Sequence, residues 1–326
     1  MQPAYTSLDQ MTAITVHSLT PDFVAEVGDV DLSRPLAPAD VDAIKQAFWK
    51  YAVLVFPDQI LSDDQHLAFA ENFGPLEVSI GVYRTDTTLR ARKELSDISN
   101  LTGDGDIWSE DSRIRRYKVG NRLWHTDSSF KFVPARASLL YARAIPPIGG
   151  DTQFADTRAA YDALSSQTKT RIQGLVAEHS IFNSRARIGF ADWLAAEREN
   201  LETVPQVLAR TVAESGRRCL YVASHAGRIF GMSEDAGRAL IDELLAHATQ
   251  RQFLHTHRWW VGDPVMWDNR CTLHRGTEYD DLRWQRDMLR ATVSDEINTC
   301  EREGVDLPEA YQAKMCAELA SRQQDE

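Results

Sequence analysis

The sequence predicts a mainly β fold with helices, namely a double-stranded β-helix (jelly-roll) core decorated by α-helices. Short apolar segments bounded by turn residues recur along the chain, for example over residues 137–144 and 290–293, as in antiparallel sandwiches and barrels. Segments with helical spacing are inserted among them. No internal repeat and no linker divides the chain, so we expect a single domain over residues 1–326.

The first elements are predicted to be a helix, a strand and a second helix. Apolar residues recur at helical spacing over residues 39–50, which indicates an amphipathic helix. Residues 52–56 form an apolar run that a proline ends, as in a buried strand. Ser62 stands three residues before Gln65, which is typical of a capping box and predicts a helix that runs to about Phe73.

The segment of residues 77–120 is polar, contains many charges and shows no regular period. A long irregular segment inside a compact domain is usually functional or mobile. It lies directly before a His-x-Asp motif at residues 125–127. We therefore expect this segment to form a lid over a site that the motif helps to build.

The remaining elements are inferred from periodicity and turn residues. Strands are predicted over residues 137–144, 219–223, 252–260, 265–267 and 290–293, and helices over residues 157–163, 167–175, 185–203 and 234–248. Residues 298–326 are polar and acidic, and we expect a helical tail there.

Composition argues against several classes of partner. The chain is 43% hydrophobic and 26% charged, as in an ordinary soluble globular protein. Its formal net charge of −12 argues against nucleic acid or an anionic membrane, which need a basic surface. A local basic cluster is nevertheless present, formed by Arg113, Arg115, Arg116 and Lys118. The longest apolar run is too short to span a bilayer.

The N-terminal residues and the cysteines bear on the compartment in which the protein works. The N-terminal residues lack the basic start and apolar stretch of a secretory signal. The four cysteines show no CxxC pair or other metal spacing, so a disulfide scaffold is not expected in a chain of this length. We expect a cytoplasmic protein that forms a homo-oligomer.

His125, Asp127 and a distant His274 carry the chemistry that the sequence indicates. Two histidines and one carboxylate suit Fe(II) and leave coordination positions open for substrate and O₂. In an extended segment, positions i and i+2 point to one face, so His125 and Asp127 can share a cavity, and the third ligand can come from any strand that closes the other side. A chance match is the alternative. Cys271, close to His274, is either a further ligand or a buried core residue.

Four short motifs extend this pattern along the chain. They are WHTDSSF at residues 124–130, GGDT at residues 149–152, WDNR at residues 267–270 and HRG at residues 274–276. Together they resemble the taurine dioxygenase family of Fe(II)- and 2-oxoglutarate-dependent oxygenases, over about residues 16–294. Residues 156–164 and 248–253 further resemble the 2,4-dichlorophenoxyacetate dioxygenase branch of that family.

The resemblance implies a role for each matching residue. His125, Asp127 and His274 would bind Fe(II), which 2-oxoglutarate chelates in this family. The far carboxylate of 2-oxoglutarate would lie on Arg286 and Thr152. An arginine fork suits a planar carboxylate because it can bind both oxygens at once.

The primary substrate is expected to be a small anion. Arg290 lies four residues beyond Arg286, so both side chains face one cavity if the segment is extended. In the family an arginine here holds the anionic group of the substrate, and the alternative is a solvated face of charges. The resemblance also places His225 near the substrate and Asn100 beside a carboxylate, and Lys118 would add a positive charge at the mouth of the site. His225 can equally be a structural histidine, and Lys118 can be solvated.

Three functions agree with these residues. The first is an aryloxyalkanoate dioxygenase, which uses Fe(II), 2-oxoglutarate and O₂ to hydroxylate an organic acid beside its ether oxygen and so releases a phenol and a 2-oxo acid. The second is a sulfonate or sulfate-ester dioxygenase with the same chemistry. The third is a non-catalytic or hydrolytic jelly-roll metal protein. The pair of Arg286 and Thr152 argues against the third function, because a hydrolase needs no 2-oxoglutarate.

Overall fold

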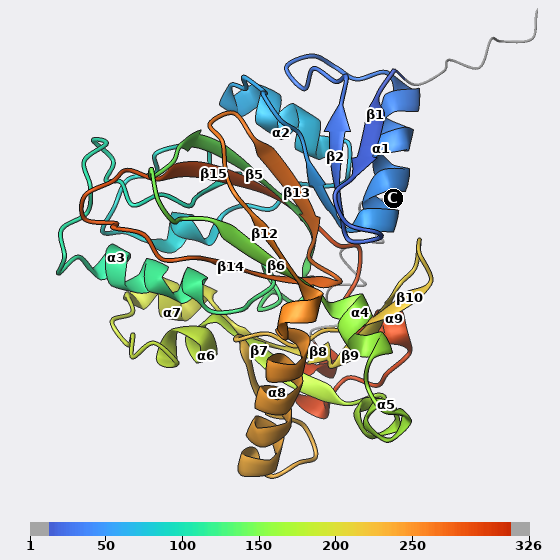
Figure 1. The fold of residues 1–326 in the computed structure, drawn as a ribbon. Coiled ribbons are helices and arrows are strands. Elements are labelled where there is room, and N and C mark those ends of the chain that lie inside the picture. The colour runs from blue at the N-terminus through green and yellow to red at the C-terminus, as the bar shows by residue number, and fades with distance from the viewer. Residues whose placement is uncertain (1–12, 314–326) are drawn as a thin grey trace, which may run out of the picture.

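Residues 13–313 are described by the computed structural model, and their largest element is a seven-stranded sheet (Figure 1). Every neighbouring pair of strands in it is antiparallel except β2 and β3. In sheet order the strands are β1 (Thr15–Ser18), β2 (Val24–Gly28), β3 (Val53–Val55), β13 (Pro264–Asp268), β5 (Ala135–Ala144), β15 (Asp287–Ser294) and β4 (Leu95–Asp97). Four of them, β3, β5, β13 and β15, confirm predicted strands.

A three-stranded sheet packs against one face of the larger sheet. Its strands are β12 (Leu254–His257), β6 (Thr152–Asp156) and β14 (Thr272–Gly276). Phe154 of β6 meets Trp267 of β13 with ring centroids 5.5 Å apart, and both side chains are buried. The two facing sheets form the predicted jelly-roll core.

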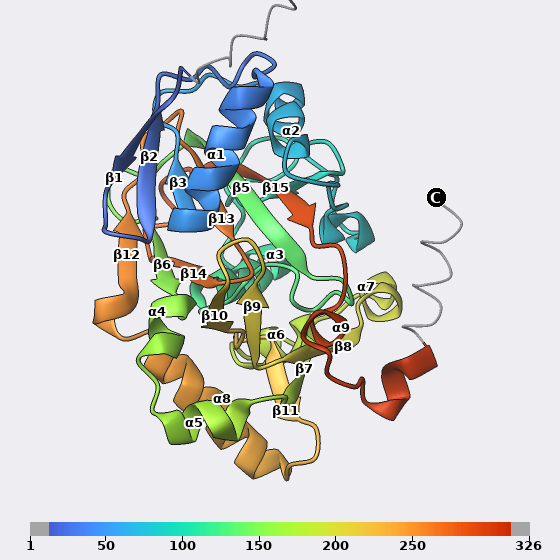
Figure 2. The same ribbon diagram turned by 90° about the vertical axis from the view of Figure 1, so that its right-hand side faces the viewer.

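Side chains alternate between the two faces of the seven-stranded sheet, as the period of two in a strand requires. Leu139 and Leu289 lie on the outer face, in one core cluster with Ile44 of α1 (Pro38–Tyr51). Their neighbours Leu140 and Met288 lie on the inner face, in the cluster that contains Phe154 and faces the smaller sheet. Figure 2 shows α1 and α2 (Asp63–Glu71) gathered on the outer side of the sheet.

The two outer helices lie where the sequence predicts them, although α2 ends at Glu71, two residues before the predicted end near Phe73. The side chain of Ser62 accepts a hydrogen bond from the backbone of Gln65, and the side chain of Gln65 accepts one from the backbone of Ser62. The predicted capping box is therefore present. After α1 the chain turns at Ala52, where φ is 63°, and enters β3 directly.

A helical end lies away from α1 and α2 in both views (Figures 1 and 2). Its helices are α4 (Thr157–Asp162), α5 (Ser166–Ile172), α6 (Ile181–Ala186), α7 (Ala195–Asn200), α8 (Glu234–Ala248) and α9 (Thr299–Glu303). This end also contains two small sheets. One has three strands, β11 (Ala226–Ile229), β7 (Val176–Ser180) and β8 (Thr203–Val207), and the other has two, β10 (Arg217–Leu220) and β9 (Ala209–Val212). The predicted helices over residues 157–163, 167–175 and 234–248 are confirmed as α4, α5 and α8.

Residues 77–120 contain little regular structure, as predicted. They hold η1 (Ile80–Tyr83), β4, α3 (Arg113–Lys118) and the start of η2 (Val119–Arg122). Arg90 ties the segment to the core, because it pairs with Asp97 and with Asp287 of β15. The basic cluster of α3 is neutralised locally, since a carboxylate contacts each of Arg113, Arg115, Arg116 and Lys118.

The helix predicted over residues 185–203 is confirmed only in part. Within that range the structure has the end of α6, at Ala186, and α7 (Ala195–Asn200), and the residues between them are not helical. Gly189, with a φ of 73°, lies in the turn that follows α6, and Phe190 and Trp193 then pack edge to face. Tertiary packing outweighs the helix-favouring composition here.

Smaller differences concern element ends. β10 ends at Leu220, before the predicted end at residue 223, and the predicted strand over residues 252–260 is η3 (Arg251–Phe253) followed by β12. The predicted helical tail contains α9, whereas residues 314–326 lie outside the described part of the chain. Among residues 13–313, no helix has the length and apolar character needed to cross a membrane.

Candidate metal centre and active site

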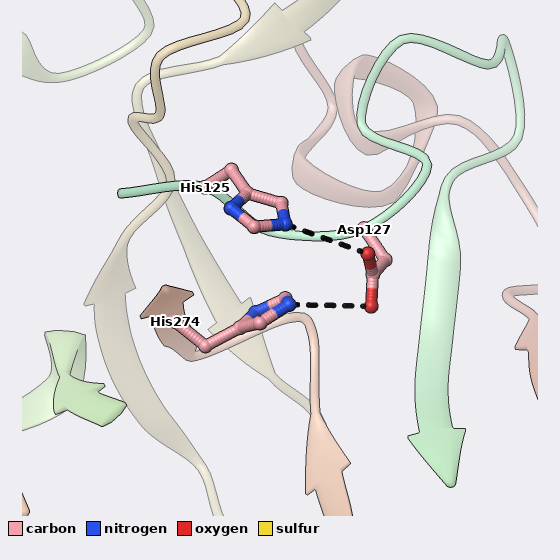
Figure 3. Close-up of side chains that lie close together, drawn as sticks. All are labelled: His125, Asp127 and His274. Atoms are coloured by element: carbon pink, nitrogen blue, oxygen red, sulfur yellow. Dashed lines mark ion pairs between the residues drawn. The ribbon is translucent and has the colours of Figure 1, made fainter. Parts of the chain in front are cut away.

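Two histidines and one aspartate converge at the edge of the jelly-roll core (Figure 3). His125 Nε2 lies 3.9 Å from Asp127 Oδ1, and His274 Nε2 lies 3.6 Å from Asp127 Oδ2. One ligand atom from each residue lies within 4.8 Å of the others, and all three residues are buried. It is the one such group among residues 13–313. Cys271, the alternative ligand, is instead buried in the inner-face core cluster.

The segment that carries the first two ligands is held by a single β-bridge rather than by a regular strand. The backbone N–H of His125 donates to the carbonyl of His274 (3.0 Å), and the N–H of His274 donates back (2.7 Å). The third ligand, in β14, thus lies directly beside His125 and not across the cavity. Ser128, with a φ of 52°, follows Asp127, and its hydroxyl donates to Glu77 Oε2 (2.7 Å). This strained turn ends the extended segment.

Asn269 holds the aspartate from behind. Its Oδ1 accepts hydrogen bonds from the backbone N–H of Asp127 (3.1 Å) and from Trp267 Nε1 (2.9 Å). Its Nδ2 donates to Ser138 Oγ (2.8 Å), which donates to Asp127 Oδ2 (2.7 Å). Thr126 turns away from the cavity and donates to the Asn269 carbonyl (2.6 Å). The sequence contains Asn269 within the WDNR motif, but its role becomes visible only when the two segments meet.

The imidazoles are neutral, as metal ligands must be. His125 Nδ1 lies 2.7 Å from the Leu123 carbonyl, which can only accept, so Nε2 presents its lone pair to the site. Burial lowers the pKa of His125, and it lowers the pKa of His274 further. Burial would raise the pKa of Asp127, but the charge of Arg290 and the hydrogen bond from Ser138 act in the opposite direction, and that pKa lies below its ordinary value. Two neutral imidazoles and an ionised carboxylate fit Fe(II).

Two adjoining pockets meet at this group, and we name each after its buried arginine. The Arg286 pocket lies against β6, β14 and β15 and includes Thr152 and His274. The Arg185 pocket lies against residues 77–103 and includes Phe130, Asp127 and His225. The residues that line both pockets are Ile98, Trp108, Lys118, Asn121, His125 and Arg290.

Arg286 is a buried cation that has no carboxylate partner among the described residues. It is 7% exposed, its Nε donates to the Gly150 carbonyl (3.1 Å) and its Nη1 to the Ile98 carbonyl (3.3 Å). Burial lowers its pKa to about 10, so the guanidinium stays charged at neutral pH. A buried charge without a counter-ion is costly, so this pocket suits an anion. Thr152 lines the same pocket, and its oxygen accepts from Trp259 Nε1 (3.0 Å), which leaves its hydroxyl proton to donate.

Asn100 holds the backbone beside Arg286. Its Oδ1 accepts from the N–H of Arg286 (2.8 Å), and its Nδ2 donates to the carbonyls of Asp281 (2.7 Å) and Trp284 (2.9 Å). Both amide protons are used. The side chain therefore has no free donor for the carboxylate that the sequence reasoning placed beside it, and it positions Arg286 instead.

The other two predicted cations are paired in this structure. Arg290 lies on the inner face of β15, lines both pockets and forms an ion pair with Asp127. It shares the Arg286 pocket with Arg286, as their spacing predicts. Lys118 Nζ contacts Asp97 Oδ2 (3.2 Å) and the Ser99 carbonyl, and burial lowers its pKa. Its positive charge is thus largely compensated within the wall of the site.

His225 and Arg185 lie in the Arg185 pocket. The ring of His225 meets the ring of His125 edge to face, with centroids 5.9 Å apart. Burial lowers the pKa of His225 well below its ordinary value, and its Nδ1 has no hydrogen-bond partner among the described residues. Arg185 is the functional candidate that sequence reasoning missed, because an arginine in a segment predicted as a charged helix looks solvated. Its signal is burial without a counter-ion, which only the fold reveals.

Comparison with known proteins gives the class of this protein. Residues 15–292 match the family described as taurine catabolism dioxygenase TauD, TfdA family. The chain is 45% identical, over 87% of its length and 99% of the relative's, to an α-ketoglutarate-dependent 2,4-dichlorophenoxyacetate dioxygenase of Cupriavidus pinatubonensis. It is 28% identical, over 87% of its length and 90% of the relative's, to an α-ketoglutarate-dependent sulfate ester dioxygenase of Pseudomonas putida.

A solved structure agrees with these sequence relatives. The structure of AAD-2 in complex with Mn(II) and N-oxalylglycine superposes with a TM-score of 0.80 at 44% identity, and covers 88% of this chain and 99% of its own. The chain therefore belongs to the TauD/TfdA dioxygenase family and is an α-ketoglutarate-dependent dioxygenase. The resemblance found in the sequence is confirmed.

Proposed function

We propose that this enzyme cleaves aryloxyalkanoates. It would hydroxylate the carbon beside the ether oxygen, so that the product collapses to a phenol and a 2-oxo acid. The observation that carries the proposal is the pair of pockets that meet at His125. One contains Arg286, which is buried and has no carboxylate partner among residues 13–313, and the other has apolar side chains along part of its wall. The relative with 45% identity, named for 2,4-dichlorophenoxyacetate, supports this substrate class.

His125, Asp127 and His274 are proposed to hold Fe(II). When bound, the metal and 2-oxoglutarate supply the oxidation of a C–H bond by O₂, with succinate and CO₂ formed from the co-substrate. The chain itself must keep two neutral imidazoles and one carboxylate in place. The Leu123 carbonyl orients the ring of His125, and the side-chain amide of Asn269 holds the backbone of Asp127.

Arg286 is proposed to receive the far carboxylate of 2-oxoglutarate. Its planar fork can donate to both oxygens, and the dicarboxylate would provide the counter-ion that none of residues 13–313 provides. Thr152 would donate its hydroxyl proton to the same carboxylate. Asn100 would act through the backbone of Arg286, which it holds by a hydrogen bond of 2.8 Å.

The primary substrate is proposed to lie in the Arg185 pocket with its anionic group on Arg290. A cation bound to Asp127 would compete with Arg290 for that carboxylate, which makes the guanidinium available to an acid. His225 and Lys118, which also line this pocket, would contact the substrate from the side. An aryl ring would lie on the apolar wall, which contains Ile80, Leu89, Leu101, Trp108 and Phe130. Residues 77–120 supply much of this wall and are proposed to act as its lid.

The runner-up is a sulfonate or sulfate-ester dioxygenase, supported by the relative with 28% identity. Both substrate classes are anions, so Arg290 does not choose between them. The apolar wall of the Arg185 pocket favours an aryl group. A non-catalytic or hydrolytic metal protein is excluded, because the chain is an α-ketoglutarate-dependent dioxygenase.

A substrate panel tests the proposal. Phenoxyacetates, 2-phenoxypropionates, alkylsulfonates and sulfate esters are offered with Fe(II), 2-oxoglutarate and O₂, and succinate formation is measured. We expect an aryloxy acid to give the highest kcat/KM, and its methyl ester to be a poor substrate because the ester offers the guanidinium of Arg290 no negative charge. Preference for an alkylsulfonate over every aryloxy acid, or rapid turnover of the ester, would favour the runner-up.

We further infer a cytoplasmic homo-oligomer without a nucleic-acid or membrane partner. The net charge of −12 and the pairing of every basic residue of the α3 cluster with an acid support the absence of such a partner. Sedimentation analysis measures the assembly, and cell fractionation the compartment. A monomer, or recovery with membranes, would contradict this inference.

A further inference from the structure

Arg185 differs from most buried arginines of this protein. Three of the five buried arginines among residues 13–313 pair with an aspartate. The three pairs are Arg158 with Asp156, Arg210 with Asp295 and Arg270 with Asp268. Arg286 and Arg185 have no such partner, and both line pockets at the metal site. Arg286 is explained by the co-substrate, so the unpaired charge of Arg185 requires its own explanation.

Among residues 13–313, the side chain of Arg185 forms hydrogen bonds only with neutral groups. The residue is 4% exposed, its Nη1 donates to Ser184 Oγ (3.1 Å) and its Nη2 to Asn121 Oδ1 (3.3 Å). The guanidinium lies over the ring of Tyr117 at 4.2 Å, and its Nε has no partner among the described residues. Burial lowers the pKa of Arg185, yet an arginine stays protonated in a protein. Several of its five N–H groups thus remain to bind an anion.

The chain leaves room for this guanidinium. A Cβ at Gly120 would lie 2.4 Å from Arg185 Nη1, and the backbone there is not in the left-handed region. The glycine therefore provides space rather than an unusual backbone conformation. Gly120, Asn121 and Tyr117 belong to the α3–η2 connection that leads directly to His125. The residues that surround Arg185 and the metal ligand His125 therefore belong to one continuous segment of the chain.

Arg185 and Arg290 bring two positive charges to the Arg185 pocket, and in this structure Arg290 pairs with Asp127 while Arg185 pairs with no carboxylate among residues 13–313. Both line it, and the charge of Arg290 contributes to lowering the pKa of Arg185. Two like charges around one pocket repel each other, and an anion between them replaces that repulsion by attraction.

We propose that Arg185 is a second guanidinium for the carboxylate of the primary substrate, which it holds together with Arg290. This inference rests on the proposed function and deepens it, because it makes the enzyme selective for acids whose anionic group can reach both cations. The apolar remainder of the acid lies on the wall built from residues 77–103 and Phe130. Arg185 is thus a specificity-determining residue that the metal and 2-oxoglutarate do not require.

Calorimetry under anaerobic conditions tests this role without turnover. The enzyme is loaded with Fe(II) and 2-oxoglutarate and titrated with 2,4-dichlorophenoxyacetate, with its methyl ester and with an alkylsulfonate. We expect Arg185→Gln to weaken the acid by about 30-fold or more, as for the loss of one partner of a buried charge pair. Arg185→Lys should lose less. Affinity for 2-oxoglutarate and for the ester should not change.

Arg187→Gln is the matched control, since Arg187 lies two residues away and pairs with Asp242 outside the pocket. It should bind the acid like the wild type. Gly120→Ala should weaken the acid in the same direction as Arg185→Gln, because the new Cβ displaces the guanidinium without removing its charge. If Arg185→Gln does not fold, Gly120→Ala and Arg185→Lys carry the test.

Two outcomes separate this inference from the proposed function. If Arg185→Gln and Arg187→Gln bind the acid alike while Arg290→Gln loses it, Arg290 acts alone and the inference is overturned, although the function stands. If the wild type binds the alkylsulfonate in preference to the aryloxy acid and Arg185→Gln loses the sulfonate, the proposed function fails and the role of Arg185 as an anion receptor is upheld.

Discussion

The two faces of the seven-stranded sheet are built from the same strands but do different work. On the outer face, Leu139 and Leu289 are buried under α1 and α2 in an apolar core. On the inner face, Ser138 holds the metal-ligating carboxylate, and Arg290 lines both pockets. Residues adjacent in sequence therefore have separate tasks, because successive side chains of a strand point to opposite faces. Substitutions one residue apart should separate stability from activity.

The largest expected effect lies at the metal ligands. His274→Ala and Asp127→Ala should lose nearly all turnover, because a ligand contributes more than the hydrogen-bonding residues behind it, which typically account for about 10–100-fold. Iron binding, measured by metal analysis after dialysis, should fall in parallel. Full iron affinity and activity in His274→Ala would show that the ligand set is misassigned.

The outer face provides the matched control for this loss. Leu139→Ala removes a fully buried side chain next to Ser138 and should cost about 2–5 kcal/mol of unfolding free energy. Iron affinity and kcat per folded molecule should stay unchanged. If Leu139→Ala abolished iron binding in the folded protein, the two faces would not be independent.

The next largest effect concerns the co-substrate. Arg286→Ala should raise the KM for 2-oxoglutarate by the equivalent of about 2–5 kcal/mol, because it removes one partner of a buried charge pair. Arg283→Ala is the control, since this exposed side chain stacks on Trp284 outside the pocket. An unchanged KM in Arg286→Ala, with a large change in Arg283→Ala, would reverse the assignment.

The predictability of the two faces from sequence also differs. The outer face follows from helical and strand periodicity, and its capping box at Ser62 is a local signal. The triad follows from a motif, but the bridge that sets His274 beside His125 does not, since it joins segments far apart in the chain. Arg185 was missed for a related reason. Arg185 does lie in a helix, α6, but the sequence does not tell that this side chain packs against Gly120 and the ring of Tyr117, because these residues are far apart in the chain.

On the outer face of the sheet, His66 makes the stability of the protein depend on pH. His66 of α2 is buried, and its Nε2 donates to the Leu139 carbonyl (3.0 Å). Burial lowers its pKa from 6.5 to about 4. In the unfolded chain His66 therefore binds a proton at a higher pH than in the folded protein. The contribution of the neutral, buried His66 to the free energy of unfolding is complete above pH 6.5 and is lost as the pH falls toward 4. The loss amounts to about 3 kcal/mol.

Urea unfolding at pH 7.5 and at pH 4.5 measures the contribution of His66 to the free energy of unfolding. His66→Gln keeps an N–H donor for the carbonyl but does not titrate, so its stability should fall less between the two pH values than that of the wild type. Other buried histidines contribute equally to both proteins and cancel in the difference. An identical pH dependence in the variant would mean that His66 is not protonated on unfolding. Iron binding at pH 7.5 should be the same in both.

The smallest expected effect concerns Thr152, in the three-stranded sheet that faces the inner side of the seven-stranded sheet. Thr152→Val preserves the shape of the first residue of β6 but removes one hydroxyl, and should raise the KM for 2-oxoglutarate by the equivalent of about 1 kcal/mol, or roughly fivefold. The substitution also deprives Trp259 Nε1 of its acceptor. Trp259→Phe is therefore the control, because it removes that N–H and leaves the hydroxyl in place. A rise in KM for Thr152→Val alone shows that the hydroxyl contacts the co-substrate. An equal rise in Trp259→Phe, with no further rise in the double variant, would show that Thr152 acts only through the tryptophan.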